Sequence, residues 1–332
     1  MHYTFLHTTT LILVMAGAVL ANSIQQLAAI QLPTGFQYPN GITHSRDHTL
    51  YVGSVTSGKI LRITTDGKTE TFFSGTDEIF AATSLRLDEQ RGILWGASPD
   101  FLGIRGADGQ VARRPHRIFA INAKRNSIGN DLRTARVLQV IPMPNGGFGN
   151  DIALDASGGV YLTDSSRPRI YYLAPGTTQL QVWAEDEQFR SRQIGLGGIA
   201  RAANGVVIVG MFSDGKLLKV TPQAQGSPKV EAILLPRSLE NPDGMQFAPD
   251  GSLLVTEGAI SSGNGRLLRI RDILDSETPR VIETLASDLE SPVNLTITGK
   301  TIWVTESRIR HRLLPGQESA VPDAFFIRQF AL

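Results

Sequence analysis

The sequence contains no cysteine among its 332 residues. Without thiols the chain can form neither a disulfide framework nor a thiolate metal site, and it cannot carry lipid on an N-terminal cysteine. Hydrophobic residues make up 41% of the chain and charged residues 19%, an ordinary globular composition that excludes disorder. A chain of this length buries a large core, so packing alone has to stabilise the fold.

The sequence also lacks an excess of charge of either sign, because 32 basic residues face 31 acidic ones and the net charge is +1. Such a balance provides no strong field to hold nucleic acid or an anionic membrane surface. No long apolar run follows the N-terminal region, which excludes a polytopic membrane protein. We therefore expect the partner to be a small-molecule substrate or ligand, and not nucleic acid.

The N-terminus carries one short apolar run, residues 11–20. The run is too short to cross a bilayer as a helix, and it ends in small residues of the kind that signal peptidases accept. We expect residues 1–21 to be a signal peptide and residues 22–332 to be secreted, as an extracellular or periplasmic protein without stable membrane insertion. A retained membrane anchor is the alternative, because His2 and His7 precede the run but no lysine or arginine does.

A strand-turn-strand phrase recurs six times, at spacings of roughly 43 to 50 residues in most intervals. Turn-forming residues such as Asp250 and Gly251 separate the first two strands of a copy. The strands expected in the six copies are 38–42, 50–54 and 59–63; 82–85, 93–97 and 117–121; 149–152, 160–164 and 169–173; 197–199, 207–211 and 216–220; 242–245, 253–257 and 266–270; and 292–295, 301–306 and a degraded third strand near 310–314.

This repeat predicts the fold, because such copies bury both faces only when they stack radially. We expect an all-β chain, a single-domain six-bladed β-propeller of four-stranded antiparallel blades. An open solenoid or a pair of sandwiches is the alternative. Outer strands fit in the gaps between copies, as at residues 70–73 and 181–183. Either residues 325–330 or residues 27–32 would supply the missing outer strand of the last blade and close the ring.

The start of the first strand and the end of the second strand in each blade share one rim of the central channel. In register, the starts are Asn40, Thr83, Asn150, Gly197, Asp243 and Val293, and the ends are Ser54, Ala97, Asp164, Met211, Glu257 and Glu306. This rim is rich in oxygen atoms, which suit a hard divalent cation such as Ca²⁺. The alternative is structural: Asn and Asp often cap turns, and an acid such as Asp164 can pair with Arg167 or Arg169.

Two pairs of phrases, residues 150–155 with 159–164 and residues 242–245 with 250–255, resemble the SMP-30/gluconolactonase/LRE-like family of six-bladed propellers. The resemblance covers nearly the whole mature chain as a blade pattern, although NHL-repeat and strictosidine-synthase-like propellers share similar phrases. In the family, a first-blade Glu, an Asn and an Asp hold a divalent cation in the channel. The resemblance implies that Asn150 and Asp243 are two of these ligands, and that Asp243 is the general base of lactone hydrolysis.

The sequence departs from the family pattern at the third ligand, where Asn40 stands in place of the glutamate. An amide for a carboxylate removes one negative charge, so we expect weaker cation binding. Some family members carry further amide ligands where this chain has Thr83 and Gly197, and neither side chain replaces an amide.

An insertion at residues 98–115 lengthens the second copy on the same rim. Loops inserted on a rigid scaffold commonly cover or shape a binding site, although a surface excursion is the alternative. If the insertion is a lid, Arg105 or Arg113 would hold a carboxylate or phosphate of the substrate.

Two histidines are expected near this rim: His116, just before the third strand of the second copy, and His311, in the third strand of the sixth. Together with Arg105 and Arg113, we take His116, Glu257 and Glu306 as candidate substrate-binding residues.

These features lead to three functional hypotheses. The first is a secreted, cation-assisted hydrolase of lactones or related esters in which Asp243 takes a proton from water. The second is a non-catalytic NHL-like propeller that binds a small molecule or a protein, which the missing glutamate favours. The third is a lyase or condensing enzyme of the strictosidine-synthase kind, which needs only a pocket and one acid.

Overall fold

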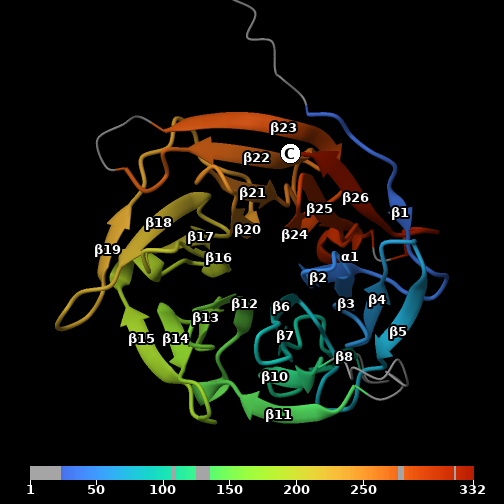
Figure 1. Cartoon of the computed structure of the whole chain (residues 1–332), viewed down its shortest axis with the longest axis horizontal. Coiled ribbons are helices and arrows are strands. Elements are labelled where there is room, and N and C mark those ends of the chain that lie inside the picture. The colour runs from blue at the N-terminus through green and yellow to red at the C-terminus, as the bar shows by residue number, and fades with distance from the viewer. Residues whose placement is uncertain (1–23, 106–109, 125–134, 276–279, 318) are drawn as a thin grey trace, which may run out of the picture.

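The computed structural model describes residues 24–105, 110–124, 135–275, 280–317 and 319–332. Six antiparallel sheets of four strands each surround a central channel, which confirms the six-bladed propeller (Figure 1). The signal peptide expected at residues 1–21 lies outside the described residues and stays a prediction. No helix in the described part of the chain combines the length and the apolar character that a membrane span requires.

Each blade is numbered here in chain order, and its strands run from the channel outward. Blade one holds β2 (Pro39–His44), β3 (Leu50–Ser54), β4 (Ile60–Ile63) and β5 (Thr69–Phe73); blade two holds β6 (Ser84–Asp88), β7 (Ile93–Ser98), β10 (Arg117–Asn122) and β11 (Val137–Pro142); blade three holds β12 (Gly149–Leu154), β13 (Val160–Asp164), β14 (Arg169–Leu173) and β15 (Gln181–Glu185). Blade four holds β16 (Leu196–Arg201), β17 (Val207–Met211), β18 (Lys216–Thr221) and β19 (Lys229–Ala232); blade five holds β20 (Pro242–Phe247), β21 (Leu253–Glu257), β22 (Gly265–Arg271) and β23 (Val281–Leu289); blade six holds β24 (Pro292–Thr298), β25 (Thr301–Glu306), β26 (Phe326–Ala331) and β1 (Ile30–Gln31).

The core lies between the blades, where the faces of neighbouring sheets meet. All five residues of β3, β13, β17 and β21 are buried, because both faces of these second strands pack against other blades. In one such interface, Ile152 and Leu162 of blade three pack in a cluster with Trp95 and Ile118 of blade two. The strands are therefore apolar on both faces, which explains why they read in the sequence as short continuous hydrophobic runs.

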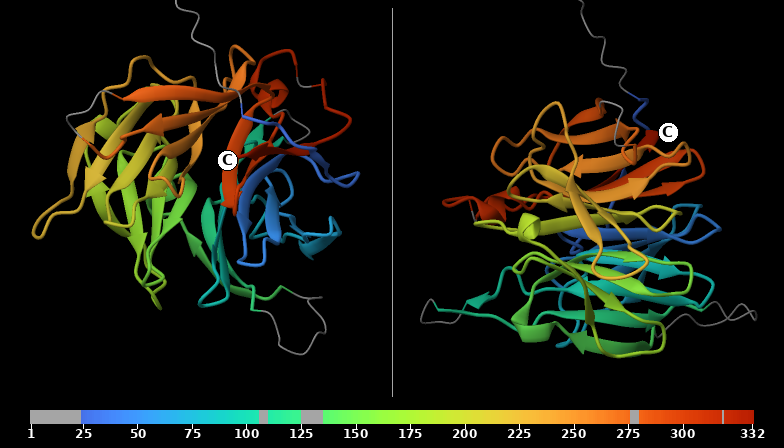
Figure 2. Two further views of the ribbon diagram at one scale, coloured as in Figure 1. Left: turned by 45° about the horizontal axis from the view of Figure 1, so that its top comes forward. Right: turned by 90° about the vertical axis from the view of Figure 1, so that its left-hand side faces the viewer.

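The two termini together complete blade six. The C-terminal strand β26 pairs along its length with β25, and the N-terminal strand β1 pairs with β26 as the outer strand. The first described residues, drawn in blue, lie beside the C-terminus in the side views (Figure 2). Residues 27–32 thus contain the closing outer strand, as one of the two alternatives predicted, whereas residues 325–330 supply the third strand.

The prediction of a third strand near residues 310–314 was wrong. This segment forms the short helix α1 (Arg310–Leu313), which belongs to the connection between β25 and β26. Because β26 takes the third-strand position, the segment has no neighbouring strand to pair with. His311 therefore lies in a helix at the rim and not in a strand.

Bulges in the first strands shape the channel. The pairing register between the first and second strands shifts in blades one, three, four, five and six, and the shifted segments include Asn40, Asn150 and Asp243. A bulge re-aims the side chains of a strand, and such irregularities are common beside active sites. The neighbouring bulges pack closely: a Cβ atom on Gly198 would lie 1.8 Å from the carbonyl oxygen of Asp243.

Candidate functional site

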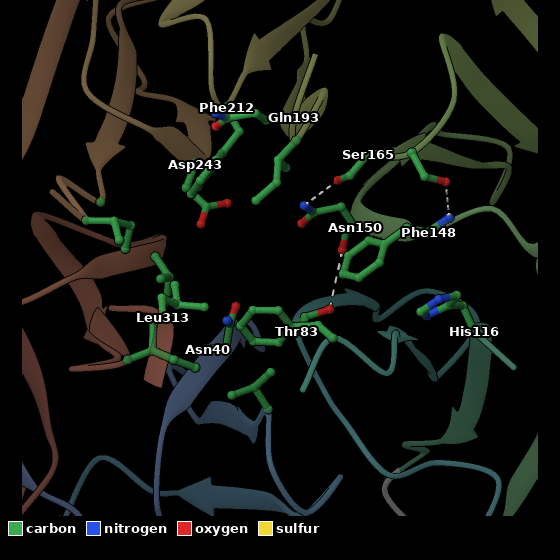
Figure 3. A pocket seen from close by; sticks show the side chains of 18 of the residues that line it. Asn40, Thr83, His116, Phe148, Asn150, Ser165, Gln193, Phe212, Asp243 and Leu313 are labelled. Atoms are coloured by element: carbon green, nitrogen blue, oxygen red, sulfur yellow. Dashed lines mark hydrogen bonds between the residues drawn. The ribbon is translucent and has the colours of Figure 1, made fainter. Parts of the chain in front are cut away.

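A cavity of about 400 Å³ opens at the mouth of the channel where the first strands begin (Figure 3). The structure brings the three expected cation ligands, Asn40, Asn150 and Asp243, into its lining. Thr83 and Val293, which hold the equivalent positions in blades two and six, line it as well. The register that the repeat predicts therefore places these side chains around one small space.

The side-chain amide of Asn150 has a fixed orientation. Its Nδ2 donates a hydrogen bond of 2.8 Å to Oγ of Ser165, and that hydroxyl donates in turn to the carbonyl oxygen of Leu196 at 2.6 Å. Because the hydroxyl of Ser165 donates its proton to this carbonyl oxygen, it can only accept a hydrogen bond from the amide of Asn150. The amide nitrogen thus points at blade three, and Oδ1 is left for a ligand in the pocket (Figure 3).

The carboxylate of Asp243 is the isolated charge of the pocket. Within the described residues it forms no hydrogen bond and no ion pair, and it points into the cavity (Figure 3). Burial raises the pKa of Asp243 well above its usual value, and the negative charge of nearby Asp151 raises it further. A group in this state can exchange a proton with water or substrate, or can bind a cation.

The layer beneath the pocket contains a second carboxylate, Asp151, whose charge is fully engaged. Its side chain is 2% exposed, it accepts from Ser84 and from the backbone amides of Ile152 and Ile199, and it pairs with Arg86 at 3.3 Å. These donors keep Asp151 in place and occupy its oxygen atoms. The two carboxylates are thus chemically distinct: one is part of the scaffold and one is free to react.

The pocket offers oxygen donors of the type that a hard divalent cation prefers, but it offers fewer of them than such a cation needs. Asn40, Asn150 and Asp243 offer oxygen atoms from three blades, whereas Ca²⁺ takes six to eight oxygen ligands in proteins. Among the described residues there is no group of three or more His, Cys, Asp or Glu side chains placed to hold a metal ion. Water or substrate would have to supply the remaining ligands, so the site suits weak binding.

His116 lines the same pocket, and its protonation state is set by the backbone. The N–H of Asp100 donates to Nδ1 of His116 at 2.8 Å, so Nδ1 must be an acceptor and the proton of the neutral ring lies on Nε2. Burial lowers the pKa of His116, a trend that Arg113 reinforces and that Asp100 and Asp164 oppose. The imidazole is therefore held as a neutral hydrogen-bond donor.

The insertion in blade two folds onto the rim. Asp100 anchors it, because this carboxylate, 2% exposed, accepts hydrogen bonds from the backbone of Gly103 and from the backbone and side chain of Arg114. Arg113 lines the pocket but donates Nη1 to the carbonyl oxygens of Asp100 and Phe101 at 2.7 and 2.8 Å. Arg113 thus holds the loop together as well as facing the cavity.

Arg105, the other arginine expected to contact substrate, lies in the two-stranded hairpin of β8 (Ile104–Arg105) and β9 (Val111–Ala112). Its side chain is outside the described part of the structure.

Glu257 and Glu306, expected to contact substrate, do not belong to the pocket lining. Glu257 is fully buried and receives a two-pronged ion pair from Arg237 at 2.6 and 2.9 Å, and Glu306 is 1% exposed and pairs with Arg328 at 2.7 Å. Burial alone would raise the pKa of Glu257, but the hydrogen bonds from Arg237 and a backbone amide outweigh it and hold the value below its usual range.

These acids share a structural role at the end of the second strand. Asp164, Glu257 and Glu306 each accept a hydrogen bond from a backbone amide in the connection that leads into the first strand, at 2.8 to 2.9 Å. For Asp164 the donor is the amide of Phe148, and no ion pair with Arg167 or Arg169 forms among the described residues. The acids therefore fix the rim loops that carry the pocket residues.

Several pocket residues were not expected from the sequence. Ile309 directly precedes α1, and Leu313 is its last residue. Connections between strands carry the other three, Phe148, Gln193 and Phe212. The spacing of Ile309 and Leu313, four residues apart, is a helical signal that could have indicated one shared face. The connections carry no repeat signal of their own, so nothing in the pattern pointed to the other three.

Comparisons with known proteins support the fold. No protein-family model matches the sequence, and no curated protein matches it either. Solved structures do match: the chain is similar to a gluconolactonase from Xanthomonas campestris at 14% identity and a TM-score of 0.57, with 94% of this chain and 92% of that one covered.

Two further structures carry different activities. The chain is similar to a luciferin-regenerating enzyme at 11% identity and a TM-score of 0.61, covering 93% and 96% of the two chains. It is also similar to virginiamycin B lyase from Staphylococcus aureus at 15% identity and a TM-score of 0.58, covering 93% and 99%. The protein therefore has the six-bladed propeller fold of gluconolactonase-like and luciferin-regenerating enzymes, as its resemblance to the SMP-30/gluconolactonase/LRE-like family implied.

Proposed function

We propose that the protein hydrolyses lactones or related esters in the pocket at the channel mouth. The observation that carries this proposal is the unpartnered carboxylate of Asp243 in the cavity lining, with its raised pKa. A carboxylate used only for structure would be paired, as Asp151, Glu257 and Glu306 are. The fold supports the proposal, since the matched propellers include a gluconolactonase, but fold alone does not decide activity.

Each residue has a defined task in the proposed reaction. Asp243 takes a proton from a water molecule as the water oxygen bonds to the carbonyl carbon, and it returns a proton to the departing oxygen as the C–O bond breaks. The neutral Nε2–H of His116 and the amide of Asn40 are the donors available to the carbonyl oxygen. The products are an acid and an alcohol, or one hydroxy acid if the substrate is a lactone.

A divalent cation, Ca²⁺ by the chemistry of its ligands, would be held by Asn40, Asn150 and Asp243 and would polarise the carbonyl group. The ligands of this chain carry a single negative charge, so we propose that the cation binds weakly. Asp243 can act as a base whether or not the cation stays bound. Arg113, where its guanidinium faces the pocket, would hold an acidic group of the substrate.

A screen of lactones and aryl esters with the purified protein tests this function. Asp243→Asn keeps the size of the side chain and removes the base, and Asp250→Asn is its matched control, because Asp250 lies in the hairpin turn of the same blade, outside the pocket. Hydrolysis by the wild type and by Asp250→Asn, lost in Asp243→Asn, supports the proposal. Equal rates in all three proteins exclude Asp243 from the reaction. Binding without turnover points to the non-catalytic propeller, and a product formed without uptake of water points to the lyase.

A further inference from the structure

The pocket wall has an apolar sector that the proposed reaction does not use. Blade six contributes Val293, Ile309 and Leu313 to the lining, and all three side chains are aliphatic. Figure 3 shows Leu313 on the side of the cavity opposite Asn150 and Ser165. The cavity is therefore amphipathic, because polar side chains from several blades share its lining with an aliphatic surface from blade six.

Helix α1, which carries Leu313 and directly follows Ile309, is held against the ring by hydrogen bonds. Nδ1 of His311 donates to the carbonyl oxygen of Arg308 at 2.9 Å, which leaves Nε2 to accept from the hydroxyl of Tyr38 at 2.8 Å. Arg310 donates to the carbonyl oxygens of Ile260 and Ser261 at 2.6 and 3.0 Å. These bonds attach α1 to blades one and five, so the hydrocarbon surface is present before a ligand arrives.

Three aromatic rings extend the apolar surface around the mouth. Phe101, Phe148 and Phe212 line the cavity, from the insertion of blade two and from the rim connections. A substrate with many hydroxyl groups would place several of them against these rings and the blade-six wall without hydrogen-bond partners. An alkyl or aryl substituent gains from the same contacts, by roughly fourfold in affinity for each buried methylene.

We propose that the substrates are esters or lactones with a hydrocarbon chain, whose carbonyl lies between Asp243 and Asn150 and whose chain lies along Val293 and Leu313. A polyhydroxylated sugar lactone is the wrong chemical class for this wall. The proposal rests on the hydrolase function above for its reaction, and on the composition of the wall for its substrate.

The experiment compares substrates of graded chain length with one polyhydroxylated lactone. The rates for γ-lactones with methyl to heptyl side chains, and for p-nitrophenyl esters from acetate to octanoate, are measured beside those for glucono-δ-lactone. We expect kcat/KM to rise by about fourfold per methylene until the 400 Å³ cavity is full. A flat series, or a preference for glucono-δ-lactone, would overturn the proposal.

Variants of Leu313 assign the effect to blade six. Leu313 is 37% exposed, so Leu313→Ser should leave the fold intact and reduce the gain per methylene; its matched control is Leu234→Ser, at a position 87% exposed and outside the pocket. Leu313→Trp should fill the cavity and move the optimum to shorter chains. If neither Leu313 variant changes the chain-length profile, the chain does not lie along blade six.

Binding separates this inference from the hydrolase function. The affinities of hexanoate, octanoate and decanoate for the wild type, measured by calorimetry, do not require turnover. Affinity that increases with chain length in a protein without hydrolytic activity supports the apolar wall and removes the hydrolase function. Hydrolysis without any dependence on chain length supports the hydrolase function and removes the apolar wall.

Discussion

The two mouths of the channel have similar volumes and opposite chemistry. The pocket that holds Asp243 measures about 400 Å³, and a second cavity, at the other end of the first strands, measures about 430 Å³. In the second cavity the charges are mostly matched: Arg86 pairs with Asp151 and Arg46 with Glu89, while Nδ1 of His44 bonds to the hydroxyl of Thr296. The fold therefore provides two openings at opposite ends of the first strands, and of the two described linings only the one with Asp243 holds a carboxylate without an ion-pair partner.

Removing the unpaired carboxylate of Asp243 should give the largest change in rate. We expect Asp243→Asn to lower kcat/KM by about 10² to 10⁴, the usual contribution of a general base, without a loss of stability because the carboxylate has no partner. Kinetics of ester hydrolysis and urea unfolding measure both quantities. A variant that retains full activity would place the base elsewhere.

Substitutions at the opposite mouth of the channel should change the free energy of unfolding. Arg86→Met leaves the buried carboxylate of Asp151 without its ion-pair partner, and removing one partner of a buried pair costs about 3 to 5 kcal/mol of unfolding free energy. Urea titration measures the change, and Arg46→Met, at the 86% exposed side chain of the other pair, is the control with an expected cost below about 1 kcal/mol. Equal effects of the two substitutions would contradict the distinction between buried and exposed pairs.

The raised pKa of Asp243 also predicts how pH acts on the protein. Activity needs the ionised base, so kcat/KM should rise with pH through a midpoint above the ordinary range of aspartate. The folded state holds this proton more tightly than the unfolded chain, so the group adds stability at low pH, and that contribution falls as pH rises from the unfolded value to the folded one.

The variant Asp151→Asn removes the neighbouring negative charge, and it should move the midpoint of the activity profile to lower pH. Profiles of wild type and variant provide the test. A midpoint that stays in place would mean that burial alone sets the pKa of Asp243.

A smaller effect is expected at His116, which the proposed reaction uses as a neutral hydrogen-bond donor. His116→Ala should lower kcat by about 10²-fold, the lower end of the loss for one oxyanion donor, whereas His116→Gln, which keeps an N–H donor, should retain more activity. Because burial lowers the pKa of His116, neither variant should remove an ionisation from the activity profile between pH 6 and pH 8, roughly the range where histidines titrate. A lost ionisation there would show that the imidazole titrates during turnover.

The smallest effect should come from the cation. Addition of Ca²⁺ or of a chelator should move the melting temperature of the wild type by a few degrees at most, because the ligands carry one negative charge. Asn40→Glu adds a second carboxylate to the set and should increase the shift with Ca²⁺. Asn40→Gln is the control, since it lengthens the side chain without charge. If Ca²⁺ has the same effect on all three proteins, it does not bind at this mouth.

The repeat made most of the strands predictable. The expected second strands 50–54, 160–164, 207–211, 253–257 and 301–306 coincide with β3, β13, β17, β21 and β25. The first four of these strands are fully buried and β25 is largely buried, so each carries a short apolar run bounded by turn residues, and that signal is local. The prediction failed at residues 310–314, where the choice between strand and helix depended on whether β26 already occupied the neighbouring position.

The site was predictable to a different degree. Asn40, Asn150 and Asp243 follow from their register within the repeat, and the structure brings them together at one mouth. The repeat places Glu257 and Glu306, at the ends of second strands, on the same rim, yet their side chains are buried in ion pairs. Register places a residue at the rim, but it does not say which partners will surround the side chain.

The sequence alone was enough to predict the six-bladed ring and the position of Asn150 and Asp243 at one mouth of the channel, because strands and turns are specified by residues that are close in the chain. Tertiary structure alone decided which acid stays free. Asp151 and Asp243 differ in their partners from other blades: Arg86 and the backbone amide of Ile199 bind Asp151, while no described group donates a hydrogen bond to the carboxylate of Asp243 or forms an ion pair with it. The stability of a buried charge depends on partners from other blades, and only the closed ring brings those partners into contact.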